Sequence, residues 1–170
     1  MSKFETLWKN HPTITDDDTP CSTNGTPNFK DQCAIRMGVC LARSGVVTRN
    51  IQGAEHCWHH DKSEGHIIRA DELARGLSRS LIAGVQKKQV VKPKAFKDTL
   101  SGKTGIIFFQ DYWRRKNETY ANRSGDHIDL WNGSRLTDWT TWCRIQLGLS
   151  LEGYWSDFTG SKEIWFFPVL

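Results

Sequence analysis

The stretch that most constrains the fold is residues 28–44, NFKDQCAIRMGVCLARS, which predicts a loop that turns into a buried helix. Asp31 is the expected N-cap, because its carboxylate can accept hydrogen bonds from the first free backbone N–H groups. Residues 35–41 are mostly apolar, as in a helix of the core, and Gly45 marks the end of the helix. This places Cys33 in the first turn.

A thiol in that position has two interpretations, and the residues alone leave both open. The positive end of the helix dipole and the unpaired backbone N–H groups favour the thiolate, which is the nucleophilic form. The same N–H groups can bind the oxyanion of a tetrahedral intermediate. In the alternative interpretation, Cys33 is simply a small buried hydrophobic residue.

Length and charge limit the class of protein. The 170 residues suit a single domain over residues 1–170, and no apolar run is long enough to predict a membrane-spanning helix. The first twelve residues lack a secretory apolar stretch, so we expect a cytoplasmic protein or one exported without a cleavable leader. The net charge of +4 does not make the basic stripe of a nucleic-acid-binding protein. We therefore expect neither a nucleic acid partner nor membrane insertion.

The cysteines and histidines raise the question of disulfides and metals. Five cysteines would leave one free thiol if the other four paired, but the sequence gives no pairing for Cys21, Cys40, Cys57 and Cys143. The segment HCWHH at 56–60 suggests a metal, yet zinc sites usually take their ligands from two separated pairs. One compact group favours a surface loop, which a disulfide from Cys57 would hold. We expect no metal and no cofactor.

Periodicity predicts helices in the first half of the chain and strands in the second. The predicted elements are helices at 1–12 and 70–85 (with Leu73, Leu77, Leu81 and Val85 in the core), a loop at 13–30, a basic connector at 86–103, strands at 105–109, 127–131 and 163–169, a polar connection at 111–125 and a helix at 138–147. Helices followed by antiparallel strands indicate an α+β fold.

A cysteine nucleophile needs a base, and His127 is the candidate because it opens a predicted buried strand. The other histidines lie in polar loops or near the terminus. Asp129 shares the strand face of His127 and would fix its ring. Asp138, beyond the turn Asn132-Gly133, is a second candidate for that role, and a helix N-cap explains it equally well.

Several segments carry a resemblance when they are taken together: FKDQCAIRMG at 29–38, TGII at 104–107, GDHIDLWNGS at 125–134, Asp138 and EIWFFP at 163–168. In this order they resemble the type VI secretion amidase effectors of the fourth family, which are papain-like cysteine peptidases related in fold to NlpC-type cell-wall peptidases. The chain departs from the family pattern at Asp126, which precedes the histidine, and at Cys143, where relatives carry a close pair.

The resemblance implies a papain-like (NlpC-type) α+β fold, in which the nucleophile helix packs on a central antiparallel sheet. It implies Cys33, His127 and Asp138 as catalytic residues, with Asp129 as the runner-up for the third. It further implies a toxin that a type VI apparatus delivers into the periplasm of a neighbouring bacterium. There it would cut peptidoglycan stem peptides at the amide between γ-D-glutamate and meso-diaminopimelate, and an immunity protein would protect the producing cell.

The remaining candidates are substrate contacts with open alternatives. The oxyanion donors are the Cys33 backbone N–H and a side chain, Gln32 or Asn28. Arg36 meets a substrate carboxylate or forms a structural salt bridge. Trp131 and Asn132 line the groove or simply pack. Two rival functions also stay open: a deamidating or transglutaminase-like toxin with a protein target, and an inactive wall-binding module.

Overall fold

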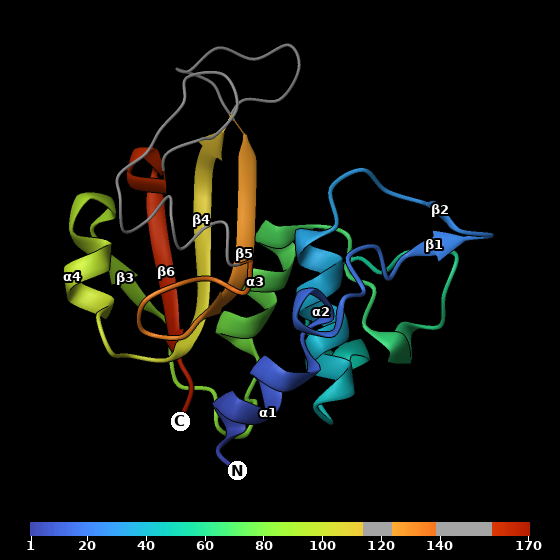
Figure 1. The fold of residues 1–170 in the computed structure, drawn as a ribbon, viewed down its shortest axis with the longest axis horizontal. Coiled ribbons are helices and arrows are strands. Elements are labelled where there is room, and N and C mark those ends of the chain that lie inside the picture. Colours follow the sequence, from blue (N-terminus) through green and yellow to red (C-terminus); the bar gives the residue numbers. More distant parts are fainter. Residues whose placement is uncertain (114–123, 139–157) are drawn as a thin grey trace.

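The computed structural model describes residues 1–113, 124–138 and 158–170. Within them, an antiparallel sheet with the strand order β3-β6-β4-β5 forms the centre (Figure 1). Its strands are β3 (Gln89–Val91), β4 (Gly105–Trp113), β5 (Gly125–Trp131) and β6 (Glu163–Pro168). Because β5 lies at the edge of this sheet, one side of it is open to contact another element.

Strand β4 is central because it is apolar on both of its faces. Ile106 and Phe108 belong to the core shared with the N-terminal helices, whereas Ile107 and Phe109 belong to a second core. A strand that is buried on both faces shows no polar alternation, which explains the continuous apolar run at its start. On one side β4 pairs with β5, with Phe109 opposite His127, and on the other it pairs with β6.

Three helices pack against one face of the sheet and a fourth packs against the other (Figure 1). The three are α1 (Lys3–Asn10), α2 (Cys33–Arg43) and α3 (Ala70–Arg79), and the fourth is α4 (Phe96–Leu100). A small hairpin, β1 (Ser22–Thr23) and β2 (Thr26–Pro27), lies beyond α2. Short 3-10 turns lie at Pro12–Thr15, Thr48–Asn50, Lys62–Glu64, Pro93–Ala95 and Phe158–Gly160. No helix in the described ranges is both long and apolar enough to cross a bilayer.

The predicted α+β fold, with the nucleophile helix on antiparallel strands, is confirmed. The predicted helix at 70–85 is wrong in its last six residues, because α3 ends at Arg79 and the backbone of Ser80 is extended. Leu81 is therefore fully exposed, and Val85 pairs with Val169 instead of extending a helix. The apolar spacing beyond Arg79 is thus not a helical face.

Two further predictions need correction. Asp31 is not the N-cap of α2: the helix begins at Cys33, its N-cap is Gln32, and no side chain caps it. The connector at 86–103 is not wholly irregular, since it contains β3 and α4. The predicted helix at 138–147 lies outside the described residues beyond Asp138, as does most of the polar connection at 111–125.

Helix α2 approaches the loop after the turn Lys62–Glu64 so closely that glycine is required on both sides. A methyl group at Gly38 would overlap the carbonyl oxygen of Gly65, and one at Gly65 would overlap Gly38 in return. Gly65 also has a φ of 80°, which favours glycine. This contact holds the loop against the outer side of the helix.

We predict that Gly38→Ala lowers the free energy of unfolding by about 2 kcal/mol, because overpacking against backbone outweighs the gain in helix propensity. Gly102→Ala is the control, since its added methyl group meets open space at a φ of 70°. It should cost only about 1 kcal/mol of backbone strain. Urea unfolding measures the free energy of unfolding of both variants. Equal decreases in the two variants would contradict the close contact at Gly38.

Candidate active site

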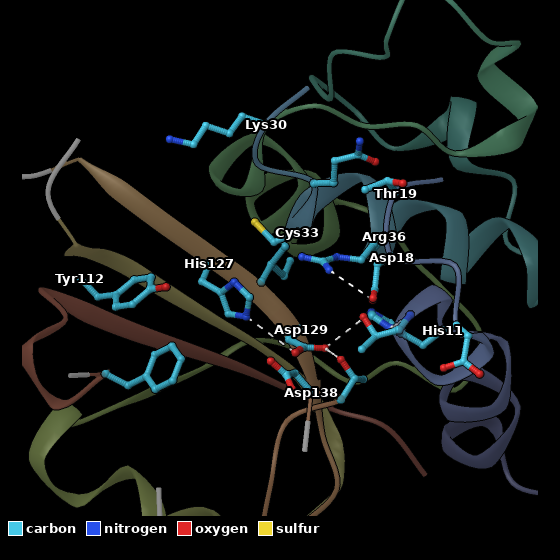
Figure 2. A pocket seen from close by; sticks show the side chains of 16 residues that line it. His11, Asp18, Thr19, Lys30, Cys33, Arg36, Tyr112, His127, Asp129 and Asp138 are labelled. Atoms are coloured by element: carbon cyan, nitrogen blue, oxygen red, sulfur yellow. Dashed lines mark hydrogen bonds and ion pairs between the residues drawn. The ribbon is translucent and has the colours of Figure 1, made fainter. Parts of the chain in front are cut away.

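A cavity of about 580 Å³ lies where the N-terminus of α2 meets the edge strand β5 (Figure 2). Its lining combines a thiol, two histidines, four aspartates and two basic side chains: Cys33, His11, His127, Asp16, Asp18, Asp129, Asp138, Lys30 and Arg36. Tyr112 and Phe158 stack on each other and add an aromatic wall. The cavity therefore offers both signs of charge around one nucleophile.

Cys33 is the first residue of α2 and is half-buried. Its Sγ atom lies 4.0 Å from the backbone oxygen of Asp126 in β5. Burial would raise the pKa of the thiol, but a hydrogen bond with His127 and the backbone N–H of Ile128 bring the pKa below its ordinary value. The position at a helix N-terminus favours the same charge state. Cys33 is thus disposed to be a thiolate.

His127 extends from β5 toward Cys33, with its Nε2 atom 3.6 Å from Asp129 Oδ2 (Figure 2). Burial alone would lower its pKa, but Asp129 and Cys33 together raise the pKa to about 9. The ring also stacks on Phe109, with the ring centroids 6.3 Å apart. At neutral pH the structure therefore favours a thiolate paired with an imidazolium.

Asp129 is the carboxylate in contact with His127, and it is buried. Its Oδ1 atom accepts hydrogen bonds from Thr137 Oγ1 and from the backbone N–H of Leu130, both at 2.7 Å. Burial would raise its pKa, yet the hydrogen bond with His127 and the one from Thr137 hold the pKa below the ordinary value. Burial also lowers the pKa of His11 to about 4, so His11 is neutral.

Asp138 is exposed and lines the same cavity next to Thr137 (Figure 2). The structure thus brings both predicted third residues to the site and puts Asp129 in the ion pair with the ring. The strand periodicity pointed to Asp129, and the resemblance pointed to Asp138. Which of them acts on His127 stays a prediction for experiment.

The family model of the type VI secretion system (T6SS) amidase effector protein 4 matches residues 29–167. The chain belongs to this family. No curated protein matches the sequence. A crystal structure of the type VI effector Tae4 from Enterobacter cloacae has the same fold, with a TM-score of 0.63 and 16% identity over 100% of this chain and 97% of that one.

Family membership makes the chain an antibacterial type VI effector and a peptidoglycan amidase, a hydrolase of the cysteine type. The matched segment begins four residues before Cys33 and includes His127, Asp129 and Asp138. Residues 1–28 lie outside the match, although His11 and Asp18 from that segment line the cavity.

Gln32 and Asn28, the predicted side-chain oxyanion donors, both form hydrogen bonds with Cys21 in the structure. The side-chain amide of Gln32 is buried and donates to the backbone oxygens of Cys21 and Phe29, at 3.1 and 3.2 Å. Its Oε1 atom accepts the backbone N–H of Cys21 at 3.0 Å. Asn28 Nδ2 donates to Cys21 Sγ at 3.6 Å. Both N–H groups of the Gln32 amide are thus engaged, and Asn28 uses one of its two. The oxyanion roles of Gln32, Asn28 and the Cys33 backbone N–H stay predictions.

The predicted groove residues Trp131 and Asn132 are structural. Trp131 is buried in the second core and donates from Nε1 to the backbone oxygen of Leu100 at 2.9 Å. Asn132 Oδ1 accepts the backbone N–H groups of Ser134 and Arg135, which fixes the turn after β5. Neither residue lines the cavity.

Arg36 lies one turn beyond Cys33 and faces the cavity, where it pairs with Asp18 at 3.8 Å (Figure 2). Asp18 is largely exposed, so the pair is screened by water and is weak. Arg36 therefore forms the predicted salt bridge with Asp18. Because that pair is weak, a substrate carboxylate could take the place of Asp18. Sequence reasoning missed His11, whose isolated position gave no sign that it would reach Asp129.

We expect an alkaline limit to activity near pH 9, because the imidazolium of His127, whose pKa is raised to about 9, must donate a proton to the leaving amine. In Asp129→Asn we expect this limit in kcat/KM to move down by about one pH unit or more, since a neighbouring carboxylate raises a histidine pKa by that order. Stem-peptide kinetics and NMR titration of the ring measure the shift.

Asp138→Asn is the matched variant, with the same change of charge at the opening of the same cavity. It should leave the alkaline limit and the His127 titration in place. If the His127 pKa falls in Asp138→Asn but not in Asp129→Asn, then Asp138 is the carboxylate that orients the ring.

Proposed function

We propose that this effector hydrolyses the amide between the γ-carboxyl of D-glutamate and meso-diaminopimelate in the stem peptides of peptidoglycan. The observation that carries the proposal is the hydrogen-bonded Cys33–His127 pair in a charged cavity of an amidase-family chain. A thiolate beside an imidazolium is suited to amide cleavage, because one group attacks and the other protonates the departing amine.

In the proposed mechanism the Cys33 thiolate attacks the amide carbon and forms a tetrahedral intermediate. The backbone N–H of Cys33, free at the start of α2, stabilises the oxyanion. His127 gives its proton to the leaving amine of diaminopimelate, and the C–N bond breaks to leave a thioester. His127, now neutral, takes a proton from water, which attacks the thioester and releases the glutamate carboxylate and the thiolate.

The charges around Cys33 fit the substrate. Next to the proposed cut, D-glutamate carries a free α-carboxylate, and diaminopimelate carries a carboxylate and an amine. Lys30 and Arg36 line the cavity as partners for the carboxylates, and the lining residues Asp16, Asp18 and Asp138 carry the charge opposite to that of the amine. Such mixed complementarity gives orientation and specificity more than raw affinity.

The site of action and the partners follow from the substrate. Peptidoglycan lies in the periplasm, so we place the activity in the periplasm of the recipient cell after type VI delivery. A cognate immunity protein in the producing cell would block the enzyme by covering the cavity. The mechanism that we propose uses no metal and no cofactor at this cavity.

Purified tetrapeptide muropeptides should gain one water and expose a new diaminopimelate amine when they are incubated with the chain. Cys33→Ala should reduce this product to background, because Cys33 is the only thiol among the described residues that line the cavity. Mass spectrometry with amine labelling follows both changes. Arg43→Gln serves as a folded control, since Arg43 pairs with Asp17 on the exterior of α2.

The same variants separate the rival functions. A deamidating or transglutaminase-like toxin would leave the muropeptides intact while Cys33→Ala still removed its toxicity. An inactive wall-binding module would keep any toxicity of a periplasm-directed chain in Cys33→Ala. Lysis from the periplasm but not from the cytoplasm, lost in Cys33→Ala, is the expected result.

Arg36→Gln should raise KM for stem peptides by about tenfold while kcat changes less, because it removes one charge-assisted contact to a substrate carboxylate. Arg43→Gln, which removes the same charge from the same helix, should leave KM unchanged. Steady-state kinetics on a defined stem peptide give the comparison. Equal KM values for the two variants would restrict Arg36 to its salt bridge with Asp18.

A further inference from the structure

A second cluster of reactive side chains lies outside the catalytic cavity, on the side of α2 remote from the sheet. It consists of Cys21, Cys57, His60 and His66, whose ligand atoms all lie within 4.8 Å of one another. Cys21 precedes the small hairpin, and the other three belong to the loop between the turn at Thr48–Asn50 and α3. The fold therefore joins residues that are well separated in the chain.

The separations of the two sulfurs and the His60 nitrogen match the edges of a tetrahedral zinc site, and the ligand atom of His66 lies within 4.8 Å of all three. With Zn–S near 2.3 Å and Zn–N near 2.0–2.1 Å, the edges of the tetrahedron are about 3.8 Å between sulfurs and about 3.5 Å between sulfur and nitrogen. The two Sγ atoms of Cys21 and Cys57 are 3.7 Å apart. The Nδ1 atom of His60 lies 3.6 Å from Cys21 Sγ and 3.3 Å from Cys57 Sγ.

Burial indicates that the cluster is built for a ligand rather than for solvent. Cys21, Cys57 and His66 are buried, and His60 is half-buried. His66 Nδ1 is inaccessible and has no hydrogen-bond partner among the described residues. An unpaired buried polar atom is costly, and a coordinate bond to a metal would satisfy it.

The surroundings resemble the outer shell of a metal site. Asn28 Nδ2 donates to Cys21 Sγ, the kind of contact that orients and stabilises a ligating thiolate. Phe29, Ile35, Val39 and Ile68 pack around the two cysteines and keep the site dry. The backbone N–H of Cys57 donates to the carbonyl of His66 at 2.8 Å, which fixes two ligands relative to each other.

We propose that Cys21, Cys57, His60 and His66 bind one Zn²⁺ as a closed structural site. Four protein ligands leave no open position for water or substrate, which separates this site from catalytic zinc. On binding, the two thiols release their protons to solvent, so that two thiolates and two neutral imidazoles balance the charge of the ion. Soft thiolate and imidazole ligands in a tetrahedron suit zinc rather than magnesium or calcium.

A zinc site here would differ from the expected surface loop without metal. Within HCWHH only Cys57 and His60 belong to the cluster, and the second pair comes from Cys21 and His66. The described cysteines are free thiols, so no disulfide from Cys57 holds the loop in this structure.

The full-length chain, purified under reducing conditions without chelator, should contain about one zinc per molecule by elemental analysis. His60→Gln and Cys57→Ser should lose the metal, whereas His59→Gln should retain it. His59 is the matched control because it is exposed, lies next to His60 and is outside the cluster. A chelator should lower the Tm of the native chain and of His59→Gln, but not that of His60→Gln.

Cobalt provides a test that does not depend on the folding of a variant. Chelator-treated, reduced native chain should take up Co²⁺ with a thiolate-to-cobalt absorption band and tetrahedral visible bands that saturate at equimolar metal. Reduced native chain that binds neither metal would overturn the proposal. So would a Cys21–Cys57 disulfide whose reduction restores no metal binding, or equal loss of zinc in His59→Gln and His60→Gln.

Discussion

The contact between the N-terminus of α2 and the edge strand β5 is the constraint on which the site depends. It brings the Cys33 thiol to the His127 ring and to the backbone of Ile128, and each group stabilises the charged form of its neighbour. An ion pair in a half-buried position survives only when its geometry is fixed. The rest of the fold holds these two elements in place: β4 and β6 behind β5, and α1 and α3 beside α2.

Helix α2 organises more than the catalytic cavity. Gln32, directly before the nucleophile, hydrogen-bonds the backbone of Cys21 with both ends of its amide. Gly38, further along, lets the loop at Gly65 approach the helix backbone. The proposed zinc ligand Cys21 therefore lies next to the start of α2, and His66 lies next to its middle, near Gly38. A metal bound by both would stabilise the position of the start of the helix. The hydrogen bonds of the Gln32 amide to Cys21 and Phe29 give it a structural role at the same place.

Local signals made much of the fold and the core of the site predictable. The apolar run at 105–109 and the position of Cys33 were visible in short windows, because burial and helix ends leave local patterns. The predictions that were wrong or missing concern features that depend on contacts between distant parts of the chain. Leu81 continues a helical spacing but lies beyond a helix that has ended, and Cys21 gives no local sign that it will meet Cys57. His11 reaches Asp129 only through the tertiary fold.

The two candidate carboxylates are not independent alternatives. Thr137 donates its hydroxyl to Asp129 and is the neighbour of Asp138 in the chain, so the buried carboxylate anchors the segment that carries the exposed one. The turn that Asn132 stabilises connects the end of β5 to Thr137 through only a few residues. A change at Asp129 would therefore alter both the charge beside His127 and the position of Asp138. Loss of activity in a variant therefore cannot by itself show which carboxylate acts on the ring. The titration of His127 can, because only a carboxylate that acts on the ring changes its pKa, whereas one that only shapes the cavity does not.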